Sequence, residues 1–91
     1  MVEEYKIILT KQADKDKEKI KQYPALKNNV TNLIELLRKN PFEVPPFYEH
    51  LIGELKGLYS RRLNKQHRLV YRVLEEEKIV MIVSMWTHHD F

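Results

Sequence analysis

The residues best suited to chemistry lie between positions 48 and 72 and near the C-terminal end of the sequence. Residues 55–72 contain no acid and six cations: Lys56, Arg61, Arg62, Lys65, Arg68 and Arg72. Glu49 lies upstream of this basic segment, and His88 and His89 lie downstream. Cleavage of a phosphodiester requires a base that takes a proton from the nucleophile, a cation that holds the developing phosphate charge, and an acid that protonates the leaving oxygen. The chain has residue types for all three tasks, but spacing alone does not bring them together.

Each of these residues also has an ordinary structural interpretation. Glu49 taken alone is a surface glutamate, and Glu43 and Glu54 compete with it as the carboxylate of a site. Arg68 can anchor a strand edge through an ion pair, but a planar, permanently charged guanidinium also binds two phosphate oxygens at once, and we favour phosphate contact. His88 suits the role of acid because a histidine has an ordinary pKa of about 6.5 and exchanges protons at cellular pH.

Other kinds of site are less well supported. The four histidines are His50, His67, His88 and His89, and they form no i,i+4 pair and have no acid cluster beside them. The chain also has no cysteine, so we expect neither a metal nor another cofactor. Ser60 lacks the sequence signature of a nucleophile elbow. His67 is expected to pack or to hydrogen-bond, and Trp86 either stacks on RNA bases or belongs to the core.

Size and charge limit the class of protein. Ninety-one residues predict one domain spanning residues 1–91, with a modest core. The net charge of +3 is mild, but the basic segment concentrates it, and such a face indicates a nucleic acid or an acidic partner. The acidic start of the sequence is unlike a signal peptide, and no apolar run approaches the length of a membrane span. We therefore expect a soluble, cytoplasmic protein without a membrane partner.

The first half of the chain predicts a strand and a helical hairpin. Residues 4–9 are rich in β-branched side chains, and Thr10 is a candidate N-cap for a helix over 11–22. Tyr23-Pro24 ends that helix because proline cannot donate within a helix and disfavours helix in the preceding residue. The second helix has a clear apolar stripe at i, i+4, i+7, i+8 and i+11, formed by Leu26, Val30, Leu33, Ile34 and Leu37. Asn40-Pro41 ends this helix.

The second half predicts a loop and three strands. Prolines mark residues 41–53 as a loop, and strands follow over 55–63, 67–74 and 78–86, the last apolar enough for burial on both faces. Alternation in the middle strand places Arg68 and Arg72, with Val70, on one face and Leu69, Tyr71 and Val73 on the other. Arg61 is expected to point to the face opposite Arg62. The order βααβββ predicts an α+β fold with the helices on one face of a small, largely antiparallel sheet.

The same residues resemble a known family. The segments Leu55-Lys56-Gly57, Tyr59-Ser60-Arg61-Arg62 and His67-Arg68-Leu69-Val70-Tyr71 are similar to the YoeB/Txe branch of the RelE/ParE toxins. That family runs Pro-Glu-Pro-Leu, Leu-x-Gly, Trp-Ser-Arg-Arg-Ile and His-Arg-Leu-Val-Tyr, and ends in His-Tyr. The resemblance covers nearly the whole chain and implies a RelE-like fold.

The resemblance also implies roles for individual residues. Glu49 matches the general base, although Tyr48 and His50 replace the two prolines around it. Arg68 matches the arginine that stabilises the phosphate, and His88 matches the general acid. At the C-terminus His89 stands where the family has tyrosine and two residues follow it, so His89 remains the alternative acid. The expected RNA contacts are Arg62, Arg61, Lys56, Lys65, Arg72 and His89, with a structural role as the alternative for Arg61.

The implied activity is that of a type II toxin–antitoxin mRNA interferase. A ribose 2′-OH attacks the adjacent phosphate of mRNA held in the ribosomal A site, and acid/base catalysis needs no metal. The implied partner is a cognate antitoxin with an acidic, disordered C-terminal segment, and a homodimer is left open. Two alternatives stand beside this hypothesis: a RelE-fold protein that binds RNA or the ribosome without cleaving, and a module that only holds an antitoxin peptide.

Overall fold

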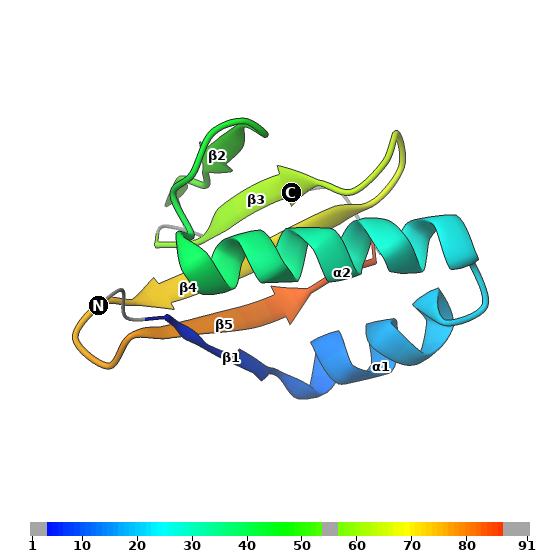
Figure 1. Cartoon of the computed structure of the whole chain (residues 1–91), viewed down its shortest axis with the longest axis horizontal. Helices are drawn as coiled ribbons and strands as arrows, with labels where there is room; N and C mark the ends of the chain where they lie inside the picture. The colour runs from blue at the N-terminus through cyan, green and yellow to red at the C-terminus, as the bar shows by residue number, and fades with distance from the viewer. Residues whose placement is uncertain (1–3, 54–56, 87–91) are drawn as a thin grey trace.

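Two helices lie on one face of a five-stranded sheet in the computed structural model of the chain, which describes residues 4–53 and 57–86 (Figure 1). The strands are ordered β1-β5-β4-β3-β2. β1 pairs with β5 in parallel, and the pairs β2·β3, β3·β4 and β4·β5 are antiparallel. The predicted α+β class, with a helical hairpin on one face of a largely antiparallel sheet, is confirmed.

The first strand and helix form where the sequence predicts them, but both are two residues shorter than the predicted ranges 4–9 and 11–22. β1 (Lys6–Leu9) leads through Thr10 into α1 (Lys11–Ile20), and the Thr10 hydroxyl accepts a hydrogen bond from the Ala13 backbone N–H at 3.1 Å. α1 has few apolar residues, so it docks partly through a buried carboxylate. Asp16 accepts a hydrogen bond from the backbone N–H of Met85 at 3.0 Å, which joins α1 to the end of the last strand.

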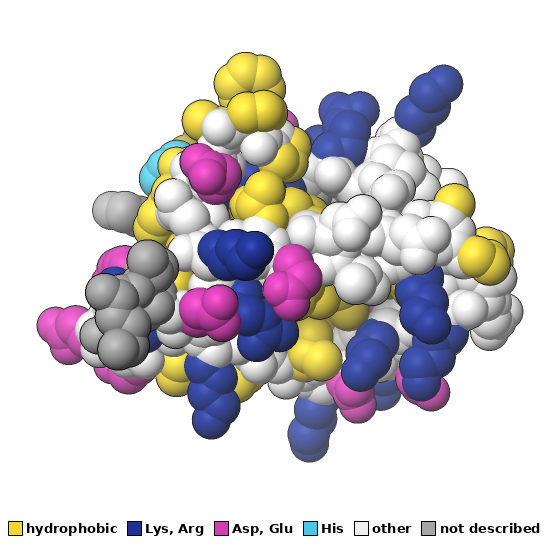
Figure 2. Space-filling view, viewed as in Figure 1, with side chains coloured by type: hydrophobic (Ala, Val, Ile, Leu, Met, Phe, Trp, Pro, Cys, Tyr) yellow, Lys and Arg dark blue, Asp and Glu magenta, His cyan; other side chains and the backbone are white. Residues whose placement is uncertain are grey.

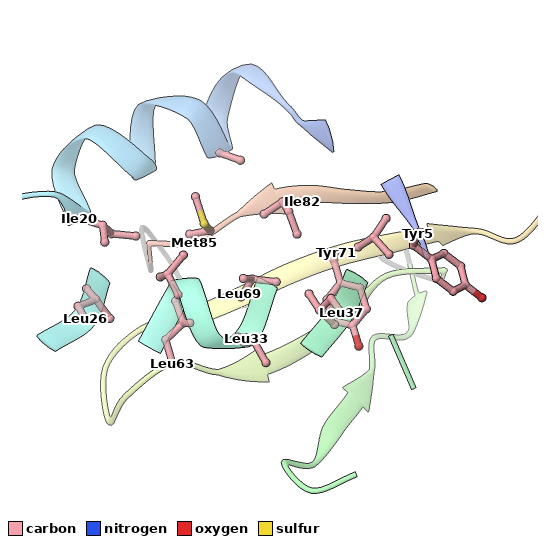
Figure 3. Close-up of a cluster of buried hydrophobic side chains, with 13 residues drawn as sticks. Tyr5, Ile20, Leu26, Leu33, Leu37, Leu63, Leu69, Tyr71, Ile82 and Met85 are labelled. Atoms are coloured by element: carbon pink, nitrogen blue, oxygen red, sulfur yellow. The ribbon is translucent and has the colours of Figure 1, made fainter. Parts of the chain in front are cut away.

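The second helix carries most of the helical contribution to the core. α2 (Pro24–Lys39) begins with a proline at its first position, where no backbone donor is needed. It ends at Asn40, as predicted, and four stripe residues are buried: Leu26, Val30, Leu33 and Leu37. All four belong to one buried cluster with Leu69, Tyr71 and Ile82 of the sheet, and Figure 3 shows Leu33 and Leu37 on the side of Leu69 and Tyr71. Removing this apolar surface from water is the main force that holds the helix on the sheet.

The three strands of the second half also fall where they are predicted, with shorter bounds. They are β3 (Tyr59–Arg62), β4 (Arg68–Leu74) and β5 (Ile79–Ser84). β5 lies between β1 and β4, but only Val80 and Ile82 are fully buried in it. The prediction that this strand is buried on both faces is wrong because the helices cover only one face of the sheet. Alternate β5 residues on the other face stay partly exposed.

One strand was not predicted. β2 (Tyr48–His50) lies within the stretch 41–53 that the prolines marked as a loop, and it adds an edge strand to β3. The observed order is therefore βααββββ. Three residues are too few for an alternation pattern to be recognised between prolines. In the part of the chain that the structure describes, no helix is long and apolar enough to cross a membrane.

Candidate active site

Two of the predicted catalytic residues are in direct contact. Arg68 Nη2 donates to Glu49 Oε1 at 2.6 Å, although the residues are 19 positions apart in the sequence. Glu49 is in the edge strand β2, Arg68 opens β4, and β3 lies between them. The side chains of Arg68 and Glu49 are 29% and 66% exposed, so a substrate can reach both.

A serine on the intervening strand orients the arginine. Ser60 pairs with Glu49 across the β2–β3 ladder, and its Oγ accepts a hydrogen bond from Arg68 Nε at 2.7 Å. Ser60 is only 1% exposed, so water does not compete for this charge-assisted bond. The bond fixes one edge of the guanidinium and directs its terminal nitrogens toward Glu49. Sequence reasoning missed this role, although period-2 alternation already places Ser60 on the same face as Arg62.

The other exposed arginines extend this cationic face. Arg62 is the Cα partner of Arg68 across the β3–β4 ladder, and its side chain is exposed. Arg72 is exposed further along β4, outside the core that Leu69 and Tyr71 enter. Lys65 is exposed in the β3–β4 turn. These positions agree with the predicted placement of the cations, while their contact with RNA stays a prediction.

Arg61 is buried, whereas a residue that contacts a nucleic acid must be exposed. It is 0% exposed, and Figure 1 shows the segment that leads from α2 to β2 at the β2–β3 edge of the sheet. Arg61 Nη1 donates to the Pro46 carbonyl at 2.6 Å, Nη2 to the Pro41 carbonyl at 2.9 Å, and Nε to the Tyr71 hydroxyl at 3.1 Å. The expectation that Arg61 contacts RNA is corrected by this burial; the residue instead anchors residues 41–46, which precede the strand that carries Glu49.

The network around Arg61 also affects a tyrosine. The Tyr71 hydroxyl donates to the Pro41 carbonyl at 2.9 Å while it accepts from Arg61. Burial raises the pKa of Tyr71 above its ordinary value, and the hydrogen bond from Arg61 opposes that rise. The tyrosine therefore keeps its proton, and its hydroxyl donates this proton in the hydrogen bond to the Pro41 carbonyl.

Aromatic rings support β2 on the face opposite Glu49. The ring of Tyr59 in β3 lies 4.6 Å from His50, 5.6 Å from Tyr48 and 5.4 Å from Phe42 between ring centroids. Contacts of this kind stabilise a pair of strands beyond their backbone hydrogen bonds. They were not predicted, because three of the four rings, those of Phe42, Tyr48 and His50, come from the stretch that the prolines mark as a loop.

The remaining candidates are settled only in part. His67 is buried and stacks on Trp86 at 4.1 Å between ring centroids, which agrees with the prediction that it packs. The predicted acid His88, its alternative His89 and the predicted RNA contact Lys56 lie outside the described residues, as does Glu54. Glu43 is exposed in the described loop. No group of three potential metal ligands occurs within residues 4–53 and 57–86, and metal-independent chemistry stays a prediction.

Known proteins resemble this chain in sequence and in fold. A family model described as the YoeB-like toxin of bacterial type II toxin–antitoxin systems matches residues 9–89. Toxin YoeB of Synechocystis is 33% identical over 65 residues, which are 71% of this chain and 73% of that protein. Toxin YoeB of Mycobacterium bovis is 44% identical over 48 residues, 53% of this chain and 56% of that protein, so the chain spans little more than half of that relative.

Solved structures match over nearly the whole chain. A YoeB/ParE toxin from Agrobacterium tumefaciens superposes with a TM-score of 0.84 at 26% identity, covering 92% of this chain and 99% of that one. The toxin of a YoeB–YefM complex from Staphylococcus aureus superposes with a TM-score of 0.82 at 30% identity, covering 93% and 98%. A YoeB dimer from the same organism superposes with a TM-score of 0.79.

Proposed function

The chain belongs to the YoeB-like toxins of bacterial type II toxin–antitoxin systems, and from this premise we propose that it is an endoribonuclease that cleaves mRNA on the ribosome. The observation that carries the proposal is the contact between Glu49 and Arg68, with Arg68 oriented by Ser60. A carboxylate and a phosphate-binding cation at one exposed point supply two of the three groups that phosphodiester cleavage requires.

In the proposed reaction the ribose 2′-OH is the nucleophile. Glu49 takes the proton of the 2′-OH as its oxygen bonds to the adjacent phosphorus. Arg68 stabilises the negative charge that develops on the phosphate oxygens. The bond from phosphorus to the 5′-oxygen then breaks, and that oxygen receives a proton from His88. The products are a 2′,3′-cyclic phosphate and a 5′-hydroxyl, and no metal or cofactor takes part.

The ion pair in the substrate-free protein fits this mechanism. Arg68 Nε donates to Ser60, Nη2 donates to Glu49, and the arginine side chain is partly exposed. A phosphate that arrives at these nitrogens replaces the carboxylate as their partner, and Glu49 is then free to accept the 2′-OH proton. Ser60 keeps the guanidinium in place during the exchange, so the arginine does not have to reorient.

The openness of the site supports a role for the ribosome. Glu49 lies on an exposed edge strand, and a surface site holds flexible RNA poorly. Alignment of the 2′-OH with the phosphate contributes a large share of the barrier lowering in reactions of this kind. We propose that the ribosomal A site supplies this alignment, and that Arg62, Arg72, Lys65 and Lys56 bind the RNA backbone electrostatically.

The proposed protein partner is a cognate antitoxin. Related structures include YoeB bound to YefM and a dimer of YoeB, both from Staphylococcus aureus. An acidic segment that is disordered when free suits the cationic face around Arg68, and it would block the access of RNA to Glu49. Like its substrate, the protein would act in the cytoplasm.

The test is primer extension on an mRNA translated in a purified system. Wild type is compared with Glu49→Gln, which keeps the shape of the side chain and removes its charge, and with Glu43→Gln, the same change in the exposed loop. Codon-phased stops with wild type and Glu43→Gln, and none with Glu49→Gln, are expected. If the mRNA stays intact although the wild-type protein binds ribosomes, the protein is a binding module. If the mRNA stays intact and the protein does not bind ribosomes, it is a module that holds only an antitoxin peptide.

A further inference from the structure

Exposed apolar side chains gather around the strand that carries Glu49. In the part of the chain that the structure describes, the large hydrophobic residues left exposed are Tyr23, Val44, Phe47 and Ile52. The last three lie close to β2 in the sequence. Figure 2 shows hydrophobic side chains at the top of the molecule, where Figure 1 places β2, and Lys and Arg side chains to the right of them. Phe47 is the most exposed of these residues, at 85%.

The ring of Phe47 is open to a ligand. Its neighbours Tyr48 and His50 pack against Tyr59, but within residues 4–53 and 57–86 no ring contact and no cation–π contact involves Phe47. A phenylalanine that stays in water forgoes the free energy of burying its apolar surface, and a flat partner that covers the ring recovers it. Packing of the described residues therefore gives no reason for an aromatic side chain at this position.

Strand register brings Phe47 to the face of the candidate active site. The β2–β3 register, continued by one residue beyond Tyr48, sets Phe47 opposite Arg62. Alternation along the same backbone puts Phe47 on the face of Glu49, two residues further on. Pro46 and Arg62 line one hollow of about 260 Å³ beside α2, which agrees with the two segments lying side by side at this point.

Arg62 supplies a free cation next to the ring. It is exposed, it is the Cα partner of Arg68, and among the described residues its guanidinium has no hydrogen bond or ion pair. The Arg68 guanidinium is instead held by Ser60 and Glu49. Phe47, Arg62 and Arg68 therefore form one row across the sheet, with the aromatic residue at its edge.

A nucleotide of single-stranded RNA is the occupant that this row fits. The two arginines attract phosphates, and each phosphate of a strand has a base beside it. Bases of single-stranded RNA stack on aromatic side chains, which Phe47 offers at this point. A purely apolar partner that covered Phe47 would also take the charge of Arg62 out of water without a partner, which is costly.

We propose that Phe47 stacks on the base next to the scissile phosphate and that Arg62 binds a phosphate of the same nucleotide. This role rests on the proposed nuclease function, since the scissile phosphate is the one that Arg68 would hold. Stacking accepts any base, because every base has a flat face, so Phe47 would position the RNA without selecting a sequence. Binding of RNA by the free protein measures this contact without cleavage.

The experiment measures RNA binding to the full chain carrying Glu49→Gln, which prevents cleavage. Two dye-labelled probes are compared by fluorescence anisotropy at low salt: a mixed-sequence RNA hexanucleotide, and a hexamer of the same ribose-phosphate backbone without bases. Phe47→Ala should weaken binding of the hexanucleotide at least about fivefold, the loss expected for one stacked base. It should leave binding of the baseless hexamer unchanged. Phe47→Leu, which has apolar bulk but no ring, should recover little of the loss.

Two control variants separate stacking from other effects. Ile52→Ala removes an apolar side chain that is 84% exposed near the other end of β2, and it should change neither affinity. Arg62→Gln should weaken both probes and lower the slope of log affinity against log salt concentration by about 0.7, the value for one phosphate contact on a single strand. Phe47→Ala should leave that slope unchanged, because stacking on a base releases no counterions, and it should leave Tm unchanged, because the ring is exposed.

Three results would overturn the stacking role. Equal weakening of both probes by Phe47→Ala would mean a contact with the RNA backbone. Unchanged affinity would assign the ring to a protein contact: to a second copy of the chain if sedimentation velocity shows that Phe47→Ala separates a dimer, and otherwise to another partner such as the antitoxin. The third is no saturable binding of the hexanucleotide by the protein that keeps Phe47. Codon-phased cleavage by wild type beside any of these results leaves the nuclease standing, and base-dependent binding without cleavage leaves the stacking site standing.

Discussion

Replacing Arg61 with glutamine should destabilise the fold, whereas the same change at its neighbour Arg62 should not. The two arginines are adjacent on β3, but Arg61 is fully buried and Arg62 is exposed. Arg61→Gln removes the donors that reach the Pro41 and Pro46 carbonyls and the Tyr71 hydroxyl. Arg62→Gln removes only an exposed charge.

The expected size of the effect follows from these contacts. A hydrogen bond from a charged donor contributes about 1.5–3 kcal/mol. The Pro41 carbonyl keeps its bond from Tyr71 after the change. The loss therefore corresponds to two bonds, about 3–6 kcal/mol out of a total of about 5–15 kcal/mol for a domain. Since each kcal/mol lowers Tm by about 4 °C or more, we expect a fall of at least about 12 °C. For Arg62→Gln we expect a change within about 0.5 kcal/mol.

Thermal and urea unfolding, followed by circular dichroism and by Trp86 fluorescence, measures both variants. Arg61→Lys keeps the charge but has one compact ammonium in place of the fork, so its stability should fall between wild type and Arg61→Gln. Equal stability of the glutamine variants at positions 61 and 62 would refute the anchoring role. The anchoring role would also be refuted if Arg61→Gln left Tm unchanged and weakened RNA binding, because that result is expected for an exposed arginine that contacts RNA.

Three further predictions concern the site and its surroundings. Ser60→Ala should lower the cleavage rate by tenfold or more and, because it removes one charge-assisted bond, lower Tm by about 6 °C, half the fall for Arg61→Gln. Ser60→Thr, which keeps the hydroxyl, should restore part of the rate; equal rates in both variants would contradict the role of Ser60 in orienting Arg68. His88→Ala should slow cleavage more than His89→Ala in the same primer-extension assay, and the reverse order would make His89 the acid. Because burial raises the pKa of Tyr71, its ionisation opposes folding: the contribution of Tyr71 to stability should be constant below pH about 10 and fall above it, and Tyr71→Phe should reduce the alkaline slope in urea titrations.

Several elements could be predicted from the sequence because their signals are local. The stripe of α2 repeats at the helical period, and all its residues face the core or its edge. Alternation in β4 separated Leu69 and Tyr71, which are buried, from Arg72, which is exposed. The Thr10 cap and the stop before Pro41 depend on one or two side chains next to the helix end. Such features need no knowledge of what packs against them.

The errors concern neighbours that are distant in the sequence. β2 was missed because its three residues are made a strand by pairing with β3, not by their own pattern. β5 was assigned two buried faces because its apolar run does not reveal that helices cover only one. Arg61 was grouped with the RNA contacts because composition cannot distinguish a buried cation from an exposed one.

The sequence by itself determined the periodic elements, the basic segment and the residue types able to cleave a phosphodiester, since each of these depends on residues that are close together in the sequence. Only the tertiary structure decided which of them meet. Strand order places β2 beside β3 and β3 beside β4, and this order brings Glu49, Ser60 and Arg68 to one point on three strands. The fold of residues 41–46 over Arg61 converts an arginine of the same basic segment into an anchor. Contacts across strands depend on pairing and register, and neither is encoded in local spacing.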